Sequence, residues 1–429
     1  MGEGAARADG AASRPRAAVV VTGSELLTGA IADRNGPWVA RELGELGFEV
    51  SHVLVVGDRP DDLAGALAFA AGAGAQVIVT SGGLGPTADD LTAEVVASFA
   101  GVPLELDEPM RAHIAEILAG WAARTGFDGP ALEQANRKQA MVPHGAVALA
   151  PVGTAPGLVV RRPDGPLIVV LPGPPRELQG MWPAALATEP MAQVLATVPA
   201  AASRSLRFFG LPESEIAATL REVDLTGVEV TTCQRRSELE VDLRPLPGAE
   251  EAAATLAGEL VARHEQHLVS AEGTSTDELV ARALLARGWT VATGESCTGG
   301  MLASRLIDRA GSSAYVAGGV VAYSNAAKSA LLDVPAALIA AHGAVSPQVA
   351  RALADGARTR FGAEVGIGIT GVAGPGGGTE GKPVGYVCFC VTTADGVVLA
   401  RDPRLPGGRT DVRERSTDVA MHLLLRVTR

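Results

Sequence analysis

Short apolar runs alternate with stretches of helical periodicity in the first part of the chain. Apolar runs occupy residues 17–23 and 48–58, and further runs begin the segments 76–92 and 166–178. An amphipathic helical pattern that ends at a glycine separates the first two runs. This alternation is typical of strand–helix–strand units around a parallel sheet. It predicts a three-layer αβα domain over residues 17–178.

The pattern changes in the rest of the chain. Segments of strand-like and helix-like sequence follow one another more irregularly over residues 200–270, which predicts a small α+β middle domain. No chemical motif is concentrated there, so we expect a spacer or a dimerisation module. Apolar runs and glycine-rich turns return over residues 275–429, which predicts a further α/β domain. Residues 1–16 contain no apolar core and are expected to form a disordered extension.

The segment 294–300, GESCTGG, lies between an apolar run and a helix-like stretch. A hydroxyl at such a turn is exposed and faces backbone N–H groups near the helix start, so Ser296 is a candidate nucleophile. A serine needs a base, and Lys328 lies in the next polar cluster, YSNAAK; burial would lower the pKa of its amine. If each residue is considered alone, the simpler interpretation is that Ser296 caps the helix and that Lys328 is exposed to solvent. Cys297, adjacent to the serine, is a competing nucleophile.

The segment 367–385 combines an apolar run with a loop too rich in glycine to present many side chains. Its backbone N–H groups are candidates to bind a phosphate or a developing oxyanion. A flexible linker is the alternative. The candidate donors are Thr370, Gly371, Gly374, Gly376, Gly377 and Gly378.

A second glycine-rich loop, SGGLGPTADDLT, follows an apolar run in the first domain. Its glycines permit close backbone approach, and its hydroxyl and carboxylate oxygens suit a divalent cation such as Mg²⁺ bound with a pyrophosphate. A simple helix cap formed by the two aspartates is the alternative. The candidates for ligand binding are Gly82, Gly83, Gly85 and Thr87, with Asp89 and Asp90 as metal ligands.

Length, charge and cysteine content limit the partners and the location that are expected for this protein. A chain of 429 residues is too long for one core, and a net charge of −12 argues against a nucleic-acid partner. No apolar stretch is long enough to span a membrane, so no membrane partner is expected either. Four cysteines form neither a disulfide framework nor a zinc pattern, which favours the cytoplasm. Cys388 and Cys390 alternate in an apparent strand and are expected to be core residues.

The ordered motifs of the last domain resemble the C-terminal domain of the competence/damage-inducible protein A (CinA) family, a nicotinamide-nucleotide (NMN) amidase. The matching segments are GESCTGG, GSS, GGVVAYSNAAK, GAVSPQVA and TGVAGPGGGTEGKPVG. The resemblance implies a metal-free amidase in which Ser296 is the nucleophile, Lys328 the general base and Tyr323 an aid to proton movement or lysine orientation. It also implies that Ser313, Asn325 and Thr370 contact the substrate. Gly381 departs from the family, where a second acidic residue is more common.

The first domain is similar to the N-terminal domain of the same family and, more distantly, to the molybdopterin-binding MoaB/MogA fold. In that comparison Glu25, Asp33 and Asp90 occupy acidic positions. The resemblance implies a metal-dependent ADP-ribose pyrophosphatase, with Asp33, Asp89 and Asp90 as the metal ligands, and a homodimer. A nucleotide- or molybdopterin-binding protein with a scaffold role in DNA uptake is the non-enzymatic alternative.

Overall fold

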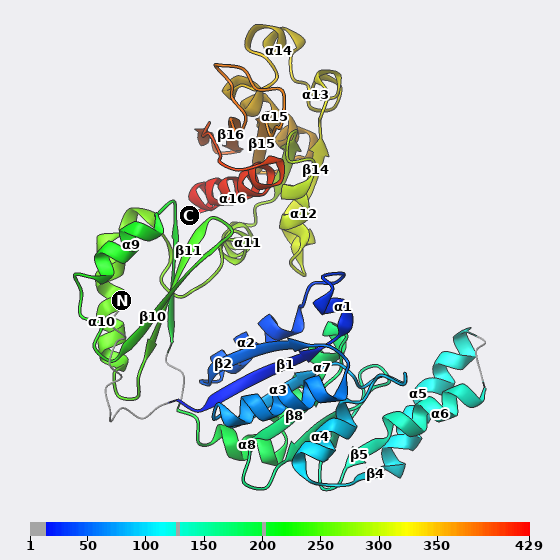
Figure 1. Ribbon diagram of the computed structural model, residues 1–429. Helices are drawn as coiled ribbons and strands as arrows, with labels where there is room; N and C mark the ends of the chain where they lie inside the picture. The colour runs from blue at the N-terminus through cyan, green and yellow to red at the C-terminus, as the bar shows by residue number, and fades with distance from the viewer. Residues whose placement is uncertain (1–13, 126–128, 200–202) are drawn as a thin grey trace. The chain divides into compact units, whose positions relative to one another are not determined.

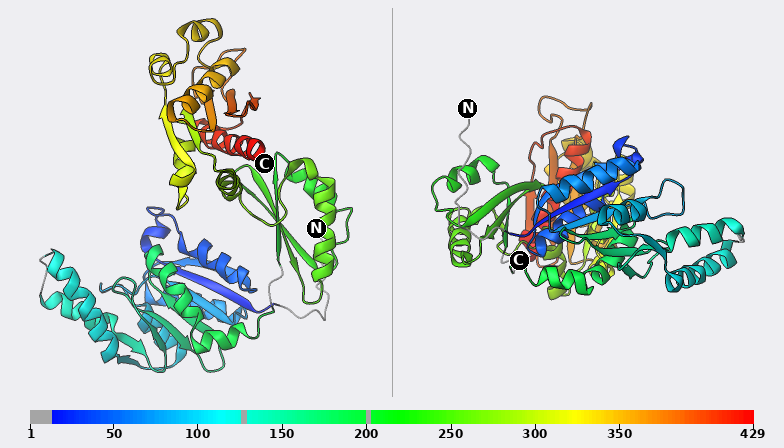
Figure 2. Two further views of the ribbon diagram at one scale, coloured as in Figure 1. Left: turned by 180° about the vertical axis from the view of Figure 1, so that it is seen from behind. Right: turned by 60° about the horizontal axis from the view of Figure 1, so that its bottom comes forward.

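The computed structural model describes residues 14–125, 129–199 and 203–429. Most of the expected N-terminal extension lies outside these ranges. The chain forms two compact units, residues 1–203 with 246–248, and residues 204–245 with 249–429. Figure 1 shows the ribbon of each unit, and Figure 2 shows them from two further directions.

The first unit is built on a six-stranded sheet with the order β2-β1-β3-β8-β7-β6. The first four strands in this order are parallel, whereas β7 and β6 are antiparallel to their neighbours. Every residue of β3 and β8 is buried, because helices cover both faces of the sheet. The strands are β1 (Arg16–Thr22), β2 (Glu49–Val56), β3 (Val77–Ser81), β6 (Val147–Leu149), β7 (Gly157–Arg161) and β8 (Leu167–Leu171).

Two sets of helices form the outer layers of this unit, as the sequence predicts. α2 and α7 pack on one face of the sheet, and α3 and α4 pack on the other. A two-stranded ribbon, β4–β5, packs beside α4, and the helices α5 and α6 extend away from the sheet (Figure 1). The elements are α1 (Ser24–Leu27), α2 (Asn35–Glu45), α3 (Pro60–Gly72), α4 (Thr92–Ala100), β4 (Leu104–Leu106), α5 (Glu108–Thr125), α6 (Pro130–Gln139), β5 (Met141–Pro143), α7 (Pro175–Leu186) and α8 (Glu189–Leu195).

The first unit continues beyond residue 178, the expected end of the first domain. Met181 and Trp182 on α7, and Met191 on α8, are buried against the same core as the strands. Burial of such large apolar side chains contributes roughly 1.5–3 kcal/mol each, so these helices are part of the folding unit.

The second unit contains two sheets. In its middle segment an antiparallel sheet, β10-β11-β9-β12, packs one face against α9 and α10. The elements are β9 (Arg204–Phe209), α9 (Glu213–Leu220), β10 (Val228–Arg235), β11 (Glu238–Pro245), α10 (Glu250–Arg263), the short 3₁₀ helix η1 (Glu265–His267) and β12 (Leu268–Ser270).

The final segment forms a five-stranded sheet with the order β14-β13-β15-β16-β17. β14, β13 and β15 are parallel, and β16 and β17 are antiparallel. α11, α12 and α16 cover one face, while α13, α14 and α15 contribute to the packing on the other. The elements are α11 (Thr276–Arg287), β13 (Val291–Glu295), α12 (Met301–Ile307), η2 (Ser312–Ala314), β14 (Val316–Val321), α13 (Asn325–Leu332), α14 (Ala336–His342), α15 (Pro347–Phe361), β15 (Val365–Gly371), β16 (Val387–Thr393), β17 (Val398–Arg401) and α16 (Arg409–Thr428).

Glycines allow α15 to pack unusually close to the sheet. A Cβ atom on Gly368 would lie 2.0 Å from the Ala350 carbonyl oxygen, and one on Gly294 would lie 2.7 Å from the Leu353 carbonyl oxygen. Glycine is therefore required at these positions of β15 and β13. The buried Cys388 and Cys390 pack in the same layer, as expected of core residues. Among the described residues, no helix has the length and apolarity needed to cross a membrane.

Candidate active site

The carboxyl ends of three parallel strands meet at one edge of the final sheet. β13 ends at Glu295, β14 ends at Val321 and β15 ends at Gly371. The Ser296 N–H donates to the Ile369 carbonyl at 3.0 Å, and the Ala322 N–H donates to the Glu295 carbonyl at 2.8 Å. These bonds tie the residues that follow β13 and β14 to the ends of β15 and β13. The residues after them are thus brought to a single location, although they are far apart in the sequence.

Ser296 and Lys328 are in direct contact at this edge. The Lys328 Nζ atom lies 3.0 Å from the Ser296 Oγ atom, and it donates to the carbonyls of Ala322 and Tyr323, each at 3.0 Å. Lys328 is only 1% exposed, and Ser296 is 7% exposed. Burial lowers the pKa of the Lys328 amine, an effect that the nearby Cys297 side chain partly opposes. The lysine is therefore a buried side chain of α13, and the solvated alternative is excluded.

Cys297 is buried beside the serine. Burial raises the pKa of its thiol to about 12. The thiol thus stays protonated at neutral pH, and a protonated thiol is a weak nucleophile. This favours Ser296 over Cys297 as the attacking group.

Glu295 is a buried carboxylate whose importance was not anticipated from the sequence. It is 1% exposed and accepts hydrogen bonds from the N–H groups of Gly300, Leu302 and Ala303 at 3.0, 3.1 and 2.8 Å. The sequence predicts that Ser296 faces backbone N–H groups near the helix start, and three of these N–H groups donate to Glu295. The Glu295 carboxylate occupies these donors, since a negative charge is favoured at a helix N-terminus.

The glycines at the end of β15 and in the loop before β16 are of two kinds: some are in close contact with neighbouring atoms, and others have open space around them. Gly371 and Gly374 are fixed by packing, because a Cβ on either would lie within 2.7 Å of a valine side chain. A Cβ on Gly378 would lie 3.0 Å from a backbone nitrogen. By contrast, a Cβ on Gly376 meets nothing within 4 Å and one on Gly377 meets only a side-chain atom at 4.0 Å, so these two positions are open to a ligand.

Three other predicted residues are placed differently from Ser296 and Lys328. The Thr370 hydroxyl is 1% exposed and donates to the Ala344 carbonyl at 2.8 Å, so its role is at least structural. Tyr323 contacts Lys328 through its backbone carbonyl, while its side chain is 64% exposed. Asn325 begins α13 and is exposed.

Ser313 lies at the other end of the sheet. It belongs to η2, which precedes β14, and β14 runs parallel to β13. It is therefore separated from Ser296 by the length of a strand, roughly 15 Å. The structure does not bring Ser313 to the Ser296–Lys328 pair of its own chain.

Two arginines of α16 complete the surroundings of the site. Arg413 donates to the carbonyls of Cys297 and Thr298 at 3.1 and 3.0 Å, and Arg409 donates to the Gly374 carbonyl at 2.8 Å. They therefore fix both the turn of residues 296–300, which we call the serine turn, and the glycine-rich loop from one helix. Arg413 is separated from Cys297 by 116 residues, so no local pattern identifies this contact.

The glycines of the loop in the first unit are needed for its internal packing. A Cβ on Gly82 would lie 2.6 Å from the Thr22 carbonyl oxygen, one on Gly83 would lie 2.1 Å from the Thr92 hydroxyl, and one on Gly85 would lie 2.5 Å from an Asp90 carboxylate oxygen. These contacts fix the shape of the loop.

The acidic residues of this unit mainly bond to nearby backbone and hydroxyl groups. Asp90 accepts from the N–H and hydroxyl of Thr87 at 2.8 and 2.5 Å. Asp33 accepts from two N–H groups at the start of α2, at 2.9 and 3.0 Å. A hydrogen bond from Thr87 is the main cause of a lowered pKa at Asp89. Within the described ranges, no three His, Cys, Asp or Glu side chains gather as a metal site requires, so these aspartates do not fit a preformed metal cage.

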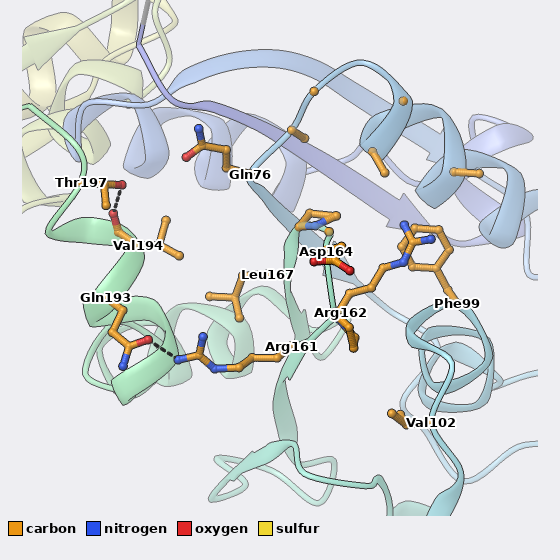
Figure 3. A pocket seen from close by; sticks show the side chains of 18 residues that line it. Gln76, Phe99, Val102, Arg161, Arg162, Asp164, Leu167, Gln193, Val194 and Thr197 are labelled. Carbon is orange, nitrogen blue, oxygen red and sulfur yellow. Dashed lines mark hydrogen bonds between the residues drawn. The ribbon is translucent and has the colours of Figure 1, made fainter.

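A cavity of 1190 Å³ in the first unit lies away from this loop. Figure 3 shows its wall, where the Arg162 guanidinium lies 4.3 Å from the centre of the Phe99 ring and Arg161 donates to Gln193 at 2.5 Å. The cavity is lined by Gln76 and Leu167, at the amino ends of β3 and β8, whereas the glycine-rich loop follows the carboxyl end of β3. The two features are therefore at opposite edges of the sheet.

Comparisons with known proteins agree with this organisation. Residues 18–193 match the family described as a probable molybdopterin binding domain, and residues 273–428 match the CinA C-terminal domain. The chain is 58% identical over 417 residues to a CinA-like protein of Mycobacterium sp. strain MCS, covering 96% of this chain and 98% of the relative. A CinA-like protein of Mycobacterium tuberculosis is 53% identical over 420 residues, covering 96% of this chain and 97% of the relative.

A solved structure matches a smaller part of the chain. The competence/damage inducible protein CihA from Agrobacterium tumefaciens is 39% identical and covers 36% of this chain and 96% of its own, with a TM-score of 0.35. Together with the near full-length relatives, the two domain matches establish that this chain belongs to the CinA-like family, with a molybdopterin-binding-like domain followed by a CinA C-terminal domain.

Proposed function

We propose that the final segment is an amidohydrolase that converts nicotinamide mononucleotide and water into nicotinate mononucleotide and ammonia. The observation that carries this proposal is the 3.0 Å contact between the Ser296 Oγ and a lysine amine that is almost completely buried. A serine paired with a base is the arrangement that covalent hydrolysis of an amide requires.

The surroundings of Lys328 suit an uncharged amine. A neutral amine has two N–H donors and one lone pair, and Nζ has three polar neighbours at 3.0 Å: two carbonyl oxygens and one hydroxyl. The two carbonyls can accept the two N–H groups, which leaves the lone pair directed at the Ser296 hydroxyl. The lowered pKa of the amine favours the same protonation state.

The reaction follows from this arrangement. Lys328 takes the hydroxyl proton as Ser296 Oγ attacks the carboxamide carbon, and the resulting tetrahedral oxyanion collapses as the proton passes to the departing ammonia. A water molecule then gives its proton to Lys328 and attacks the acyl-enzyme, which releases the carboxylic acid and restores the serine. Each acid–base step contributes roughly 10²- to 10⁴-fold to the rate.

The oxyanion requires N–H donors other than those bound by Glu295. The candidates are the N–H groups of Cys297 and Thr298, whose carbonyls accept hydrogen bonds from Arg413, and those of the open positions Gly376 and Gly377. The open positions are also candidates for binding the substrate phosphate.

Ammonia release tests the reaction and the substrate together. We expect release from NMN to exceed release from nicotinamide and from glutamine, because only NMN offers both the carboxamide and the phosphate. Ser296→Ala is expected to abolish release while the protein melts as the wild type does. Turnover of NMN by the alanine variant would contradict the proposal.

The first unit is a molybdopterin-binding-like domain, and its activity remains a prediction. Hydrolysis of ADP-ribose is the prediction that follows from the family resemblance, but Asp33, Asp89 and Asp90 do not form a preassembled cage for the required cation. Incubation with ADP-ribose and Mg²⁺, with and without EDTA, tests it directly. Ammonia release from NMN is expected to be insensitive to EDTA, since no step assigned to Ser296 and Lys328 uses a metal. Homodimerisation and a cytoplasmic location also remain predictions.

A further inference from the structure

A tight turn in the middle segment adopts an unfavourable backbone conformation. β10 and β11 pair up to Arg235 and Glu238, so only Arg236 and Ser237 connect them. These residues have φ values of 49° and 58°, a region in which hairpin turns usually place Asn or Gly. Such strain persists where surrounding contacts hold it.

The contacts that hold this turn reach three helices of the final segment. Ser237 Oγ donates to Asp418 Oδ2 on α16 at 2.6 Å, and Arg236 donates to Asp277 on α11 at 3.3 Å. Arg305 on α12 lies between the two carboxylates. It donates to Asp277 at 2.7 and 2.9 Å and to Asp418 at 2.6 Å.

The centre of this network is almost free of solvent. The side chains of Arg305 and Asp418 are 8% and 7% exposed. Removing one member would leave a buried charge incompletely paired, which is strongly unfavourable. The network therefore favours one arrangement of the helices. One turn further along α16, His422 lies 3.1 Å from Glu238, the first residue of β11, which gives α16 a second connection to the hairpin.

Two helices of this network, α12 and α16, also contact or adjoin the serine turn. α12 begins directly after it, at Met301, and α16 carries Arg413, which donates to the carbonyls of Cys297 and Thr298. Arg413 lies about one and a half helical turns before Asp418. A displacement of α16 at Asp418 is therefore transmitted to the turn that holds Ser296.

We propose that the hairpin of the middle segment positions the nucleophile of the final segment, with Ser237 as a positioning residue that acts through Asp418 and α16. The inference rests on the proposed amidase function, which it deepens. It assigns to the middle segment a role in the reaction beyond that of a spacer.

Two substitutions of Ser237 distinguish a role in positioning the nucleophile from a role in folding the protein. Ser237→Gly removes the hydroxyl but suits the positive φ, so the relief of strain opposes the loss of the hydrogen bond and the variant is expected to fold. Ser237→Asn also suits this backbone and restores a donor that can reach Asp418. Ser214→Ala, at an exposed serine on α9 of the same segment, is the matched control.

The variants are compared by NMN turnover and by hydrogen exchange of the amides of residues 296–303. A misplacement of catalytic groups by about 1 Å can cost 10²-fold, so we expect kcat of Ser237→Gly to fall by roughly tenfold or more, with KM within about twofold of wild type. We also expect faster exchange in residues 296–303. Ser237→Asn is expected to recover most of the rate and the protection, and Ser214→Ala is expected to match the wild type in both.

The inference is overturned if Ser237→Gly keeps the wild-type kcat and the wild-type exchange, or if Ser237→Asn is as impaired as Ser237→Gly. Failure of the proposed function gives a different result, namely no ammonia release by the wild type itself. In that case exchange in residues 296–303 still tests the positioning: acceleration in Ser237→Gly alone supports it, and identical protection in all variants refutes it.

Discussion

Replacement of Lys328 is the sharpest test of the proposed base. Lys328→Met keeps the length of the side chain but removes the amine 3.0 Å from Ser296 Oγ. Lys328→Arg keeps a positive charge and hydrogen-bond donors, but a guanidinium does not lose its proton in proteins. If Lys328 acts as a base, both variants are inactive; if it contributes only positive charge, the arginine variant retains activity.

The expected loss of kcat/KM follows from the proposed role of Lys328 as the general base. Loss of a general base costs roughly 10²- to 10⁴-fold in kcat/KM, which corresponds to about 2.7–5.4 kcal/mol of transition-state stabilisation. Stability should change little in Lys328→Met. The variant loses two hydrogen bonds to the carbonyls of Ala322 and Tyr323, worth about 1 kcal/mol each, but it no longer has to bury an amine.

The assay is ammonia release from NMN at several pH values, with thermal melting as the check on folding. Because the pKa of Lys328 is lowered from 10.5 in the folded protein, the unfolded chain binds more protons below that value. Wild-type stability should therefore rise with pH, from the folded pKa towards 10.5, and the methionine variant should lack this contribution. A folded Lys328→Met variant that retains more than about one tenth of the wild-type kcat/KM would refute the assignment of the base.

Four further predictions concern the same site. Cys297→Ala should keep NMN turnover within a few fold of wild type, because burial raises the pKa of that thiol to about 12; loss of activity on this change would favour the cysteine as nucleophile. Wild-type kcat/KM should increase with pH as Lys328 loses its proton and then level off, and a profile that falls over the same range would contradict a neutral amine. Glu295→Gln should destabilise the second unit by about 1–3 kcal/mol, measured by thermal melting, because an amide N–H₂ would face backbone N–H donors. Gly385→Ala should destabilise the protein, since a Cβ there would lie 2.1 Å from the Leu405 carbonyl oxygen, whereas Gly376→Ala should leave stability unchanged and raise KM for NMN if the loop contacts the substrate.

Local patterns in the sequence were sufficient to predict much of the sheet architecture. The run 167–171 is continuously apolar, and in the structure every residue of β8 is buried. Such a run is characteristic of a central strand covered on both faces. The end of the first domain was harder to predict, because the burial of Met181 and Trp182 depends on which surface α7 meets rather than on the pattern of α7 itself.

The proximity of two site residues was predictable because each lies in the segment that follows a strand, whereas other contacts of the site were not predictable. Ser296 and Lys328 both follow strands whose carboxyl ends lie at the same edge of the sheet, so their proximity follows from the topology. The contacts of Arg413 depend on the packing of α16 onto the sheet and have no local signal. The position of Glu295 did carry a signal, because an acidic residue at the end of an apolar strand needs several donors, and the following small residues lead into a helix that provides them.

The separate hydrogen-bond partners of Glu295 and Lys328 explain how an acid next to Ser296 in the sequence and an amine in contact with Ser296 can both be buried without forming a salt bridge. The carboxylate receives its hydrogen bonds from the backbone at the start of α12, whereas the amine donates its own to backbone carbonyls after β14. If the carboxylate were directed at the amine instead, it would stabilise the ammonium and raise its pKa, and Lys328 could no longer accept a proton from Ser296. In the proposed mechanism the helix that follows the serine therefore has an indirect role: by binding the carboxylate, it leaves Lys328 able to act as the base.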